Sequence, residues 1–294
     1  MIARAGIVAK RGLTAAAPHL RRLVRWLAER GVEPIVETGT ATLLGEAGAG
    51  VRSASREDLP TLVDLVVVLG GDGTLLSVAD RIGDAGCGTP ILGINFGRIG
   101  FLTEVTLPEM VPALESALAG TAVVHERVML HGALRRDGVV RARHVVLNDV
   151  VITRGLISRL IYLAVHIDDL FITNVRADGL IIASPTGSTA YNLAAGGPIV
   201  HPVVDALLLT PIAAHSFANR PIVVPGGSSI SVRGAAGDAT TGEVFASFDG
   251  QTGVAMEPGD ELVVTRADKR LHLLGSPTRG YYDTLREKLR WGER

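Results

Sequence analysis

The run of residues 62–69 constrains the fold more than any other part of the sequence, because seven of its eight side chains are apolar. A strand of this kind is expected in the middle of a parallel sheet, buried on both faces. Shorter apolar runs at 6–9, 34–37 and 90–95 predict three more strands, and apolar residues at helical spacing predict a helix over 18–30. Strands that alternate with helices in this way indicate an open α/β sheet.

The second half of the chain has a different pattern of predicted elements. A helix predicted over 108–118 ends at Gly120, and strand and turn signals dominate after it. The predicted strands are 127–134, 139–146, 150–153, 160–167, 171–175, 180–183, 222–224, 229–233, 244–248 and 261–266. We therefore expect an α/β N-terminal domain with an open, mainly parallel sheet over 1–118, and a mostly-β C-terminal domain over 119–277. The C-terminal helix, 278–294, is expected to complete the first domain.

Charge and cysteine content exclude several classes of function. The 294 residues carry a formal net charge of −1, so neither a nucleic-acid partner nor a membrane surface is expected. No apolar stretch approaches the ~20 residues of a membrane-spanning helix. The single cysteine, Cys87, cannot form an internal disulfide or a cysteine-based metal cage. We expect a cytoplasmic protein that acts on a small molecule.

The sequence Gly70-Gly71-Asp72-Gly73-Thr74 follows the apolar run directly. Ligands of open α/β sheets bind beyond the carboxyl ends of the strands, where this turn is expected. Glycine lets backbone N–H groups approach a phosphate closely, and the start of the next helix adds partial positive charge. Asp72 is the only charged side chain of the turn and can orient a metal ion or accept a proton from a hydroxyl. The alternative is a tight strand-to-helix turn in which Asp72 caps the helix.

Glycines and polar residues also follow the strand 90–95. The stretch 93–103 places Asn95 at the strand end and includes Arg98, whose guanidinium suits phosphate. This stretch either belongs to the same binding site or is a structural crossover into the second domain, and the sequence leaves both possibilities open.

A second chemical motif lies in 176–202. The strand 180–183 leads into a loop of small hydroxyl residues whose donors and acceptors suit phosphate and ribose. These residues are Ser184, Thr186, Ser188 and Thr189. A short helix expected to begin near Ser188 offers another anion site, and Tyr191 offers a face on which a base can stack. Asp178, just before the strand, can accept hydrogen bonds from an amide or a ribose.

The other polar residues of this half are expected to be structural. His201 is interpreted as a hydrogen-bonded structural residue, since histidine is intermediate in its tendency to be buried. The stretch 210–221, which contains His215 and Arg220, is interpreted as a structural loop. No spacing of histidine, cysteine and carboxylate residues suggests a structural metal, so any metal is expected to be Mg²⁺ held mainly through substrate phosphates.

Together these motifs resemble the NAD kinase family. The likeness covers 70–74, 93–104, 148–149, 176–202, 210–225 and 249–251. The first motif is also similar to the equivalent loop of diacylglycerol and sphingosine kinases, whereas 178–197 points to NAD kinases. The resemblance implies the NAD kinase and diacylglycerol kinase fold, and an enzyme that phosphorylates the 2′-hydroxyl of the adenosine ribose of NAD to give NADP. It also implies Mg²⁺, a phosphate donor that is ATP or polyphosphate, and a homodimer or homotetramer.

The resemblance further implies roles for individual residues. Asp72 matches the family's proposed proton acceptor for the 2′-hydroxyl. Asn148 and Asp149 match a dipeptide that contacts adenosine, and 189–194 matches the segment that wraps the nucleotide, with Tyr191 beside the adenine. The candidate binding residues combine those chosen for their chemistry with those that match the family. They are Gly70, Gly71, Gly73, Thr74, Asn95, Asn148, Asp149, Arg159, Arg176, Asp178, Thr186, Ser188, Thr189, Ala190, Tyr191, Asn192, Ala194 and Gln251.

The chain departs from the family pattern at a few of these positions. Asp149 stands where the family usually has glutamate, and its side chain is one methylene shorter, which reduces the reach of the carboxylate. Asn192 and Ala194 stand where the family often has serine, and Arg159 stands where relatives can have histidine. Two other functions stay open, a lipid kinase on the same scaffold and a non-catalytic nucleotide sensor. The polar hydroxyl loop argues against the first, and the intact Asp72 turn argues against the second.

In the expected mechanism the adenosine ribose of NAD lies near Asp72, which takes or orients the proton of the 2′-hydroxyl. The hydroxyl oxygen then attacks the terminal phosphorus of the donor. Most of the acceleration is expected from positioning of the two substrates and from neutralisation of phosphate charge.

Overall fold

The computed structural model describes residues 2–97, 99–155, 160–216, 219–234, 243–276 and 278–291. The chain forms two compact units. Unit 1 comprises Met1–Glu126 and Leu271–Arg294, and unit 2 comprises Arg127–Arg270. The divisions lie after Glu126 and before Leu271, whereas the sequence places them after 118 and 277. Two long strands, β7 (Val124–Arg136) and β18 (Glu261–Leu274), have residues in both units.

Unit 1 is built on a parallel sheet. Its strands are β1 (Arg4–Ala9), β2 (Glu33–Glu37), β3 (Arg52–Ala54), β4 (Leu65–Gly70), β5 (Ile91–Asn95) and β6 (Val105–Thr106). They lie in the order β5-β4-β1-β2-β3, and β6 and the end of β18 pair in parallel with β5. All six residues of β4 are buried, as the apolar run predicts. The strand begins at Leu65 and not at 62, because Leu59–Leu62 forms the short helix α3.

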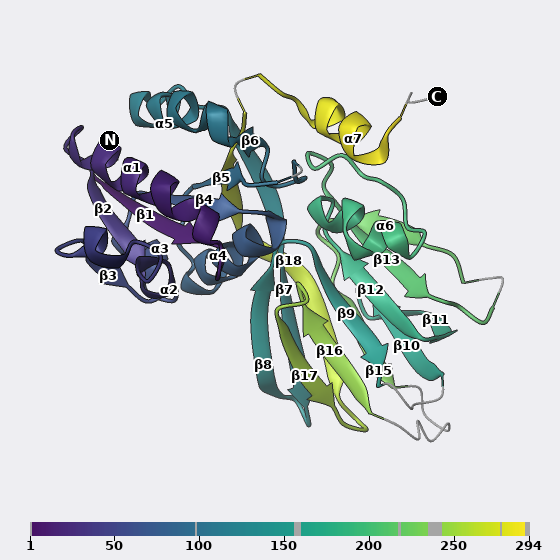
Figure 1. The fold of residues 1–294 in the computed structure, drawn as a ribbon. Helices are drawn as coiled ribbons and strands as arrows, with labels where there is room; N and C mark the ends of the chain where they lie inside the picture. The colour runs from purple at the N-terminus through teal and green to yellow at the C-terminus, as the bar shows by residue number, and fades with distance from the viewer. Residues whose placement is uncertain are drawn as a thin grey trace. The chain divides into compact units, whose positions relative to one another are not determined.

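Helices cover both faces of this sheet. Figure 1 shows α1 (Ala17–Ala28) and α5 (Met110–Ala119) on one side and α3 with α4 (Asp72–Ala85) on the other. Apolar side chains of α1 and α5 share one core cluster with β1, β4 and β5. The shorter elements are η1 (Thr14–Ala16), α2 (Thr38–Ala41), η2 (Gly45–Gly48), η3 (Leu107–Glu109) and α7 (Tyr281–Leu289). The predicted helix stop at Gly120 is present, since Gly120 has a left-handed φ of 71°.

Unit 2 contains two sets of antiparallel strands. The first has the order β14-β13-β12-β9-β16-β17, and the second has the order β11-β10-β15-β18, with β7 pairing to β18 and β8. The remaining bounds are β8 (Val139–Val146), β9 (Asp149–Arg154), β10 (Ile161–Ile167), β11 (Leu170–Ala177), β12 (Gly179–Ala183), β13 (Ala206–Ile212), β14 (Ile222–Pro225), β15 (Ile230–Gly234), β16 (Val244–Phe248) and β17 (Thr252–Met256). Side chains from both sets meet in one apolar core. The α/β and mostly-β character predicted for the two halves is confirmed.

The helix expected near Ser188 has a different form. After β12 the chain makes a 3₁₀ turn, η4 (Thr186–Thr189), and then the four-residue helix α6 (Tyr191–Ala194). Ala190 separates the two with φ −94° and ψ −130°, outside the helical region. The short helix predicted near Ser188 is therefore divided into two four-residue turns, and neither is long enough to provide the anion site that was expected at its N-terminus.

Candidate functional site

Asp72 is the first residue of α4, at the carboxyl end of β4. Its Oδ2 accepts a hydrogen bond from the N–H of Phe101, at 2.8 Å. Its Oδ1 accepts three, from the N–H of Leu102 at 3.2 Å and from the N–H and hydroxyl of Thr103 at 3.0 and 2.9 Å. The residue before α4, Gly71, has no side chain that could cap the helix, and Asp72 bonds the loop 101–103 and not the start of α4. The interpretation of Asp72 as a helix cap was therefore wrong.

Two residues of 93–103 make this arrangement possible. A Cβ on Gly100 would lie 1.9 Å from Oδ1 of Asp72, so only glycine lets the loop approach the carboxylate. Asn95 is buried, donates to the hydroxyl of Thr103 at 2.9 Å and accepts from the N–H of Gly97 at 2.6 Å. The Asn95 side chain thus holds the loop, and Arg98 lies outside the described residues.

The glycines of the turn differ from one another in their surroundings. A Cβ on Gly70 would lie 2.7 Å from Oγ1 of Thr74, so the lack of a side chain at Gly70 is required by packing. Apart from the chain neighbours and the backbone of α4 itself, no atom of the described residues lies within 4 Å of a Cβ built on Gly71 or on Gly73. The backbone at these two positions is therefore open to a ligand at the start of α4.

In unit 2, Asp249 organises the dipeptide that follows β8. Its carboxylate accepts hydrogen bonds from three successive N–H groups, those of Leu147, Asn148 and Asp149, at 2.7, 2.8 and 2.9 Å. The N–H of Asp249 donates in return to the carbonyl of Asp149 at 3.0 Å. Asp249 lies in a tight turn with a φ of 48°. Sequence reasoning missed it as a site residue, although an Asp-Gly pair directly after a strand is a signal for such a turn.

The carboxylate of Asp149 lies in an unusual environment. The residue is only 5% exposed, although it is charged in its usual state. Burial, and after it the negative charge of Asp249, raises the pKa of the Asp149 carboxyl to about 7. Its proton can therefore be exchanged near neutral pH, which the sequence alone does not reveal.

The predicted hydroxyl loop is tied to its own surroundings. Ser184 donates to the carbonyl of Leu147 at 2.6 Å and accepts from the N–H of Gly187. The hydroxyl of Ser188 donates to the carbonyl of Val200 and accepts from its N–H, both at 3.0 Å. Thr186 is buried, and Thr189 makes a longer bond of 3.4 Å to the Thr186 carbonyl. These hydroxyls fix the loop beside the dipeptide 148–149.

Glycine again permits the close approach. A Cβ on Gly187 would lie 2.1 Å from the backbone carbonyl oxygen of Asn148. The structure therefore brings the hydroxyl loop, Asn148 and Asp149 together, as the resemblance implies. In the turn after β16, Gln251 is exposed, and its N–H donates to Phe248 at 2.8 Å.

The segment 189–194 presents one side chain outward and one inward. Tyr191 is 45% exposed, so the face of its ring is accessible to a base. Asn192 is fully buried; it donates to the carbonyls of Ser188 and Pro198 and accepts from the hydroxyl of Thr210 at 2.6 Å. Ala190 is partly exposed and Ala194 is exposed. Asn192 therefore holds the segment from inside, where the family often has serine.

The remaining predicted residues lie around β12. Asp178 pairs with Nε of Arg154 at 2.9 Å. The guanidinium of Arg176 lies 5.3 Å from the centre of the Tyr162 ring. Nδ1 of His201 accepts from the N–H of Val203 at 3.3 Å. Arg159 lies outside the described residues.

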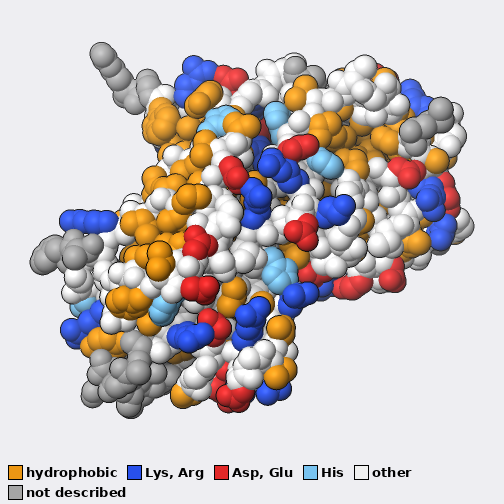
Figure 2. All heavy atoms as spheres, turned by 180° about the vertical axis from the view of Figure 1, so that it is seen from behind, with side chains coloured by type: hydrophobic (Ala, Val, Ile, Leu, Met, Phe, Trp, Pro, Cys, Tyr) orange, Lys and Arg blue, Asp and Glu red, His pale blue; other side chains and the backbone are white. Residues whose placement is uncertain are grey.

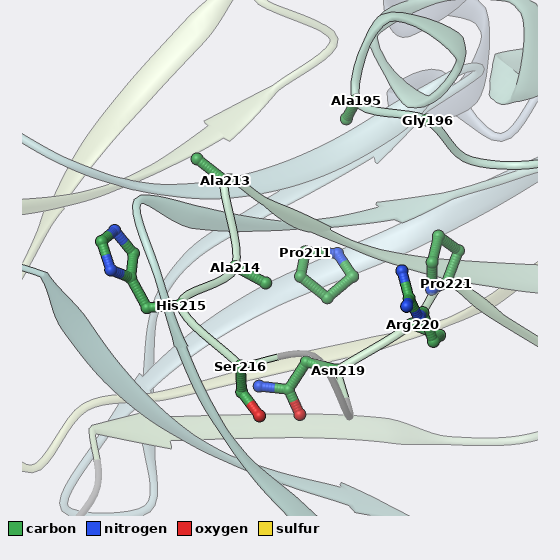
Figure 3. A pocket seen from close by; sticks show the side chains of 10 residues that line it. All are labelled: Ala195, Gly196, Pro211, Ala213, Ala214, His215, Ser216, Asn219, Arg220 and Pro221. Atoms are coloured by element: carbon green, nitrogen blue, oxygen red, sulfur yellow. The ribbon is translucent and has the colours of Figure 1, made fainter.

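A cavity of about 580 Å³ lies within unit 2, next to α6. Its wall is formed by Ala195, Gly196, Pro211, Ala213, Ala214, His215, Ser216, Asn219, Arg220 and Pro221 (Figure 3). In this view His215 and Arg220 lie on opposite sides of Pro211, and Ser216 lies beside Asn219. The stretch expected to be a structural loop thus contains the end of β13 and much of a cavity wall.

We also searched the described residues for a metal cluster, a charged surface patch and a membrane-spanning helix. Among the described residues, no group of three or more histidine, cysteine, aspartate or glutamate side chains is arranged to hold a metal ion. On the face drawn in Figure 2, acidic and basic side chains are interspersed among uncharged ones. None of the helices in the described part combines the length and apolar character needed to span a bilayer.

The chain matches two protein-family models. Residues 5–122 match the ATP-NAD kinase N-terminal domain, and residues 147–275 match the ATP-NAD kinase C-terminal domain. Among curated relatives, the NAD kinase of Geotalea daltonii is 47% identical over 272 residues, which are 92% of this chain and 93% of the relative. The NAD kinase of Syntrophotalea carbinolica is 44% identical over 99% of both chains.

Solved structures give the same result. The yeast NADH kinase, in complex with NADH, superimposes with a TM-score of 0.87 and 27% identity, over 99% of this chain and 88% of that one. An NAD kinase from Archaeoglobus fulgidus, in complex with ATP, has a TM-score of 0.74 and 25% identity, over 97% of this chain and 99% of that one. The fold class and the kinase activity predicted from the motifs are both confirmed. The chain therefore belongs to the NAD kinase family and is a kinase that acts on NAD.

Proposed function

We propose that the chain transfers the terminal phosphoryl group of ATP to the 2′-hydroxyl of the adenosine ribose of NAD, and so makes NADP. The observation that carries this proposal is the Asp72 site, where an oriented carboxylate lies at the start of α4 beside two open glycines. The complexes of related kinases with NADH and with ATP support the two substrates.

Asp72 has acceptor capacity left for a substrate. A carboxylate offers about four lone-pair sites, two on each oxygen. Among the described residues, Oδ1 already accepts three hydrogen bonds, whereas Oδ2 accepts only that of Phe101. We therefore assign Oδ2 as the atom that receives or orients the proton of the 2′-hydroxyl. The loop 101–103 holds that atom in place before the substrate arrives, which is the form of preorganisation that catalysis needs.

The start of α4 is the proposed place for the phosphates of the donor. The open backbone at Gly71 and Gly73 allows close approach, and a 14-residue helix contributes partial positive charge at its first turn. Asp72 is the one acidic residue of that turn. The described residues offer no ready-made cage for a cation, so Mg²⁺ would be held mainly by the phosphates, whose charge it would neutralise.

The acceptor would be recognised by residues of unit 2. Asn148 and Asp149 have their backbone fixed by Asp249, and Tyr191 exposes the face of its ring. The cavity that begins at Ala195 and includes Arg220 and His215 is large enough for part of a dinucleotide. We assign the adenosine to the first group and place another part of NAD in the cavity.

An assay of NADP formation across donors and acceptors tests the proposal. ATP, another nucleoside triphosphate and polyphosphate are each supplied with NAD or NADH and Mg²⁺. The proposal requires NADP from ATP and NAD. Turnover with polyphosphate alone would replace ATP as the donor, and phosphorylation of diacylglycerol without NADP would favour a lipid kinase. Tight binding of NAD without turnover on any donor would favour a nucleotide sensor.

Self-association is a separate part of the proposal. The family resemblance supports a homodimer or a homotetramer. Light scattering coupled to gel filtration distinguishes the two from each other and from a monomer, for which the calculated mass is 30.8 kDa.

A further inference from the structure

The C-terminal segment of unit 1 contacts the loop that holds Asp72. Nη1 of Arg279 donates a hydrogen bond to the backbone carbonyl of Glu104 at 2.7 Å, across 175 positions of sequence. The same guanidinium lies 3.7 Å from Oε2 of Glu109. Glu104 follows Thr103 directly, and Thr103 donates two of the four hydrogen bonds to Asp72.

The same segment reaches the other end of the loop. Nζ of Lys288, on α7, lies 5.8 Å from the centre of the Phe101 ring. Phe101 is the residue whose N–H donates to Oδ2 of Asp72. The C-terminal segment therefore contacts the loop at its first residue, through Lys288, and just after its last, through Arg279.

A third contact anchors the segment near Arg279. The hydroxyl of Thr278 donates to Oε1 of Glu109 at 2.9 Å. Oε2 of Glu109 accepts from both the N–H and the hydroxyl of Thr106, at 2.8 Å each. Glu109 thus links the C-terminal segment to β6, the strand that leaves the loop.

The loop depends on such contacts because it has no regular structure of its own. Residues 99–104 lie between β5 and β6 and belong to neither helix nor strand. Their backbone is hydrogen-bonded by side chains from elsewhere, namely Asp72, Asn95 and Arg279. Of these three, Arg279 has no role assigned to it by the sequence motifs.

We propose that Arg279 is a positioning residue for phosphoryl transfer. By holding the carbonyl of Glu104, it keeps the N–H groups of 101–103 in the places where they orient the Asp72 carboxylate. The inference rests on the role proposed for Asp72. Arg279 acts on the chemical step through the loop, so its loss lowers kcat more than it changes KM for NAD.

The test compares two arginine-to-methionine substitutions in the same segment. Arg279→Met removes the hydrogen bond and keeps much of the apolar stem. Arg286→Met is the matched control, because Arg286 is 64% exposed and its ion pair is with Asp283 on its own helix. We expect Arg279→Met to lower kcat about 10-fold with KM for NAD within about twofold, since small misplacements of a catalytic group cost rates of this order. Arg286→Met keeps the wild-type values.

Hydrogen exchange supplies a readout that does not require turnover. In Arg279→Met the amides of Phe101, Leu102 and Thr103 are expected to exchange at least about 10-fold faster, as local opening becomes easier, while amides of β4 keep their protection. Arg279→Lys, which keeps a cationic donor, is expected to recover part of both properties. If the wild-type chain makes no NADP, the proposed function fails, and the exchange rates still decide whether Arg279 holds the loop.

Two results would overturn the inference. One is an Arg279→Met enzyme whose kcat is within twofold of the wild type. The other is unchanged exchange at the three loop amides. Arg279→Gln, an uncharged donor of shorter reach, replaces the methionine variant if that variant does not fold. Loss of kcat with faster loop exchange then supports the role, and wild-type values of either contradict it.

Discussion

At the residue scale, the carboxylate of Asp72 is defined by the groups that donate to it. Three backbone N–H groups and one hydroxyl fix both of its oxygens. In Asp72→Asn, the amide nitrogen replaces one of these oxygens and meets an N–H donor where an acceptor is needed. We expect kcat for NADP formation to fall by about 10²–10⁴, the usual range for loss of a general base.

A substitution at the other end of α4 controls for this measurement. Asp84→Asn makes the same chemical change on the same helix, where the carboxylate pairs with Arg81 on the surface. It should leave kcat within about twofold, as surface ion pairs contribute little. Turnover by Asp72→Asn at the wild-type rate would remove Asp72 from the chemical step.

Asp149 predicts a pH dependence of stability with a definite sign. Its pKa is raised from 3.8 to about 7 in the folded protein, by burial and then by the charge of Asp249. Between these values the folded protein keeps a proton that the unfolded chain has released. The free energy of unfolding therefore falls as pH rises from about 4 to 7, by about 4 kcal/mol from this group, and is level above 7.

Asp149→Asn isolates that contribution, because asparagine stays neutral at every pH. Urea unfolding at pH 4.5 and pH 8 should show that the variant gains stability over the wild type only at the higher pH. Asp137→Asn, in an exposed turn, is the control and should show no such difference. A variant that is equally stabilised or destabilised at both pH values would contradict the raised pKa.

At the element scale, the loop before β6 and the turn after β4 use glycine for different reasons. Gly100→Ala would place a Cβ 1.9 Å from Oδ1 of Asp72, so the carboxylate or the loop must move. The new Cβ of Gly71→Ala meets no atom of the described residues within 4 Å, apart from its chain neighbours. We expect Gly100→Ala to lower kcat by about 100-fold and also the melting temperature, since it disturbs packed structure.

For Gly71→Ala we expect an unchanged melting temperature but a KM for ATP raised by about 10-fold, because the methyl group obstructs phosphate at the helix start. Gly88→Ala, another open glycine with unstrained backbone, is the control and should change neither quantity. An unchanged KM in Gly71→Ala would show that the donor phosphates do not approach that backbone.

Elements with a regular apolar pattern were predicted well from the sequence, and those with special local chemistry were not. The strands 139–146 and 244–248 have the predicted bounds. The strand β13, Ala206–Ile212, was not predicted. One reason is that it contains Pro211, and proline argues against a strand. The structure accommodates this proline because β14 pairs with 206–209 of β13, and Pro211 lies beyond that register.

The candidate site shows the same division. Asp72 was found because a charged residue flanked by glycines stands out in a sequence, and Asn148 and Asp149 were found through the resemblance to the NAD kinase family. Phe101 and Leu102 were not found, because they act through backbone N–H groups that every residue except proline has. Arg279 was not found because the residue it holds is 175 positions away.

At the scale of the whole molecule, the α/β and mostly-β halves were recognised from their patterns of predicted helices and strands. The positions at which the chain divides between them were not. The chain divides after Glu126 and before Leu271, inside the long strands β7 and β18. A strand shows no change of periodicity at the point where its contacts pass from one unit to the other. The helix stop at Gly120 marks the end of an element and lies several residues before the division of the chain.

The molecule as a whole is expected to fold without a metal and to need one for turnover. A structural metal site requires several ligands, and the described residues contain no suitable group of three or more histidine, cysteine or carboxylate side chains. Mg²⁺ is therefore expected to arrive with the phosphates of ATP. Excess EDTA should lower NADP formation by more than about 100-fold, and added Mg²⁺ should restore it.

Excess EDTA should shift the melting temperature by less than about 1 °C. A ligand stabilises a protein only through its affinity for the folded state, and no metal is expected to be bound to the folded chain before ATP is added. Differential scanning fluorimetry with and without EDTA, in the absence of nucleotide, measures this directly. ATP with Mg²⁺ should raise the melting temperature, whereas Mg²⁺ alone should not. A fall of several degrees on chelation would place a metal in the fold itself, and the carboxylates of Asp72, Asp149 and Asp249 would then be the first residues to substitute in search of its ligands.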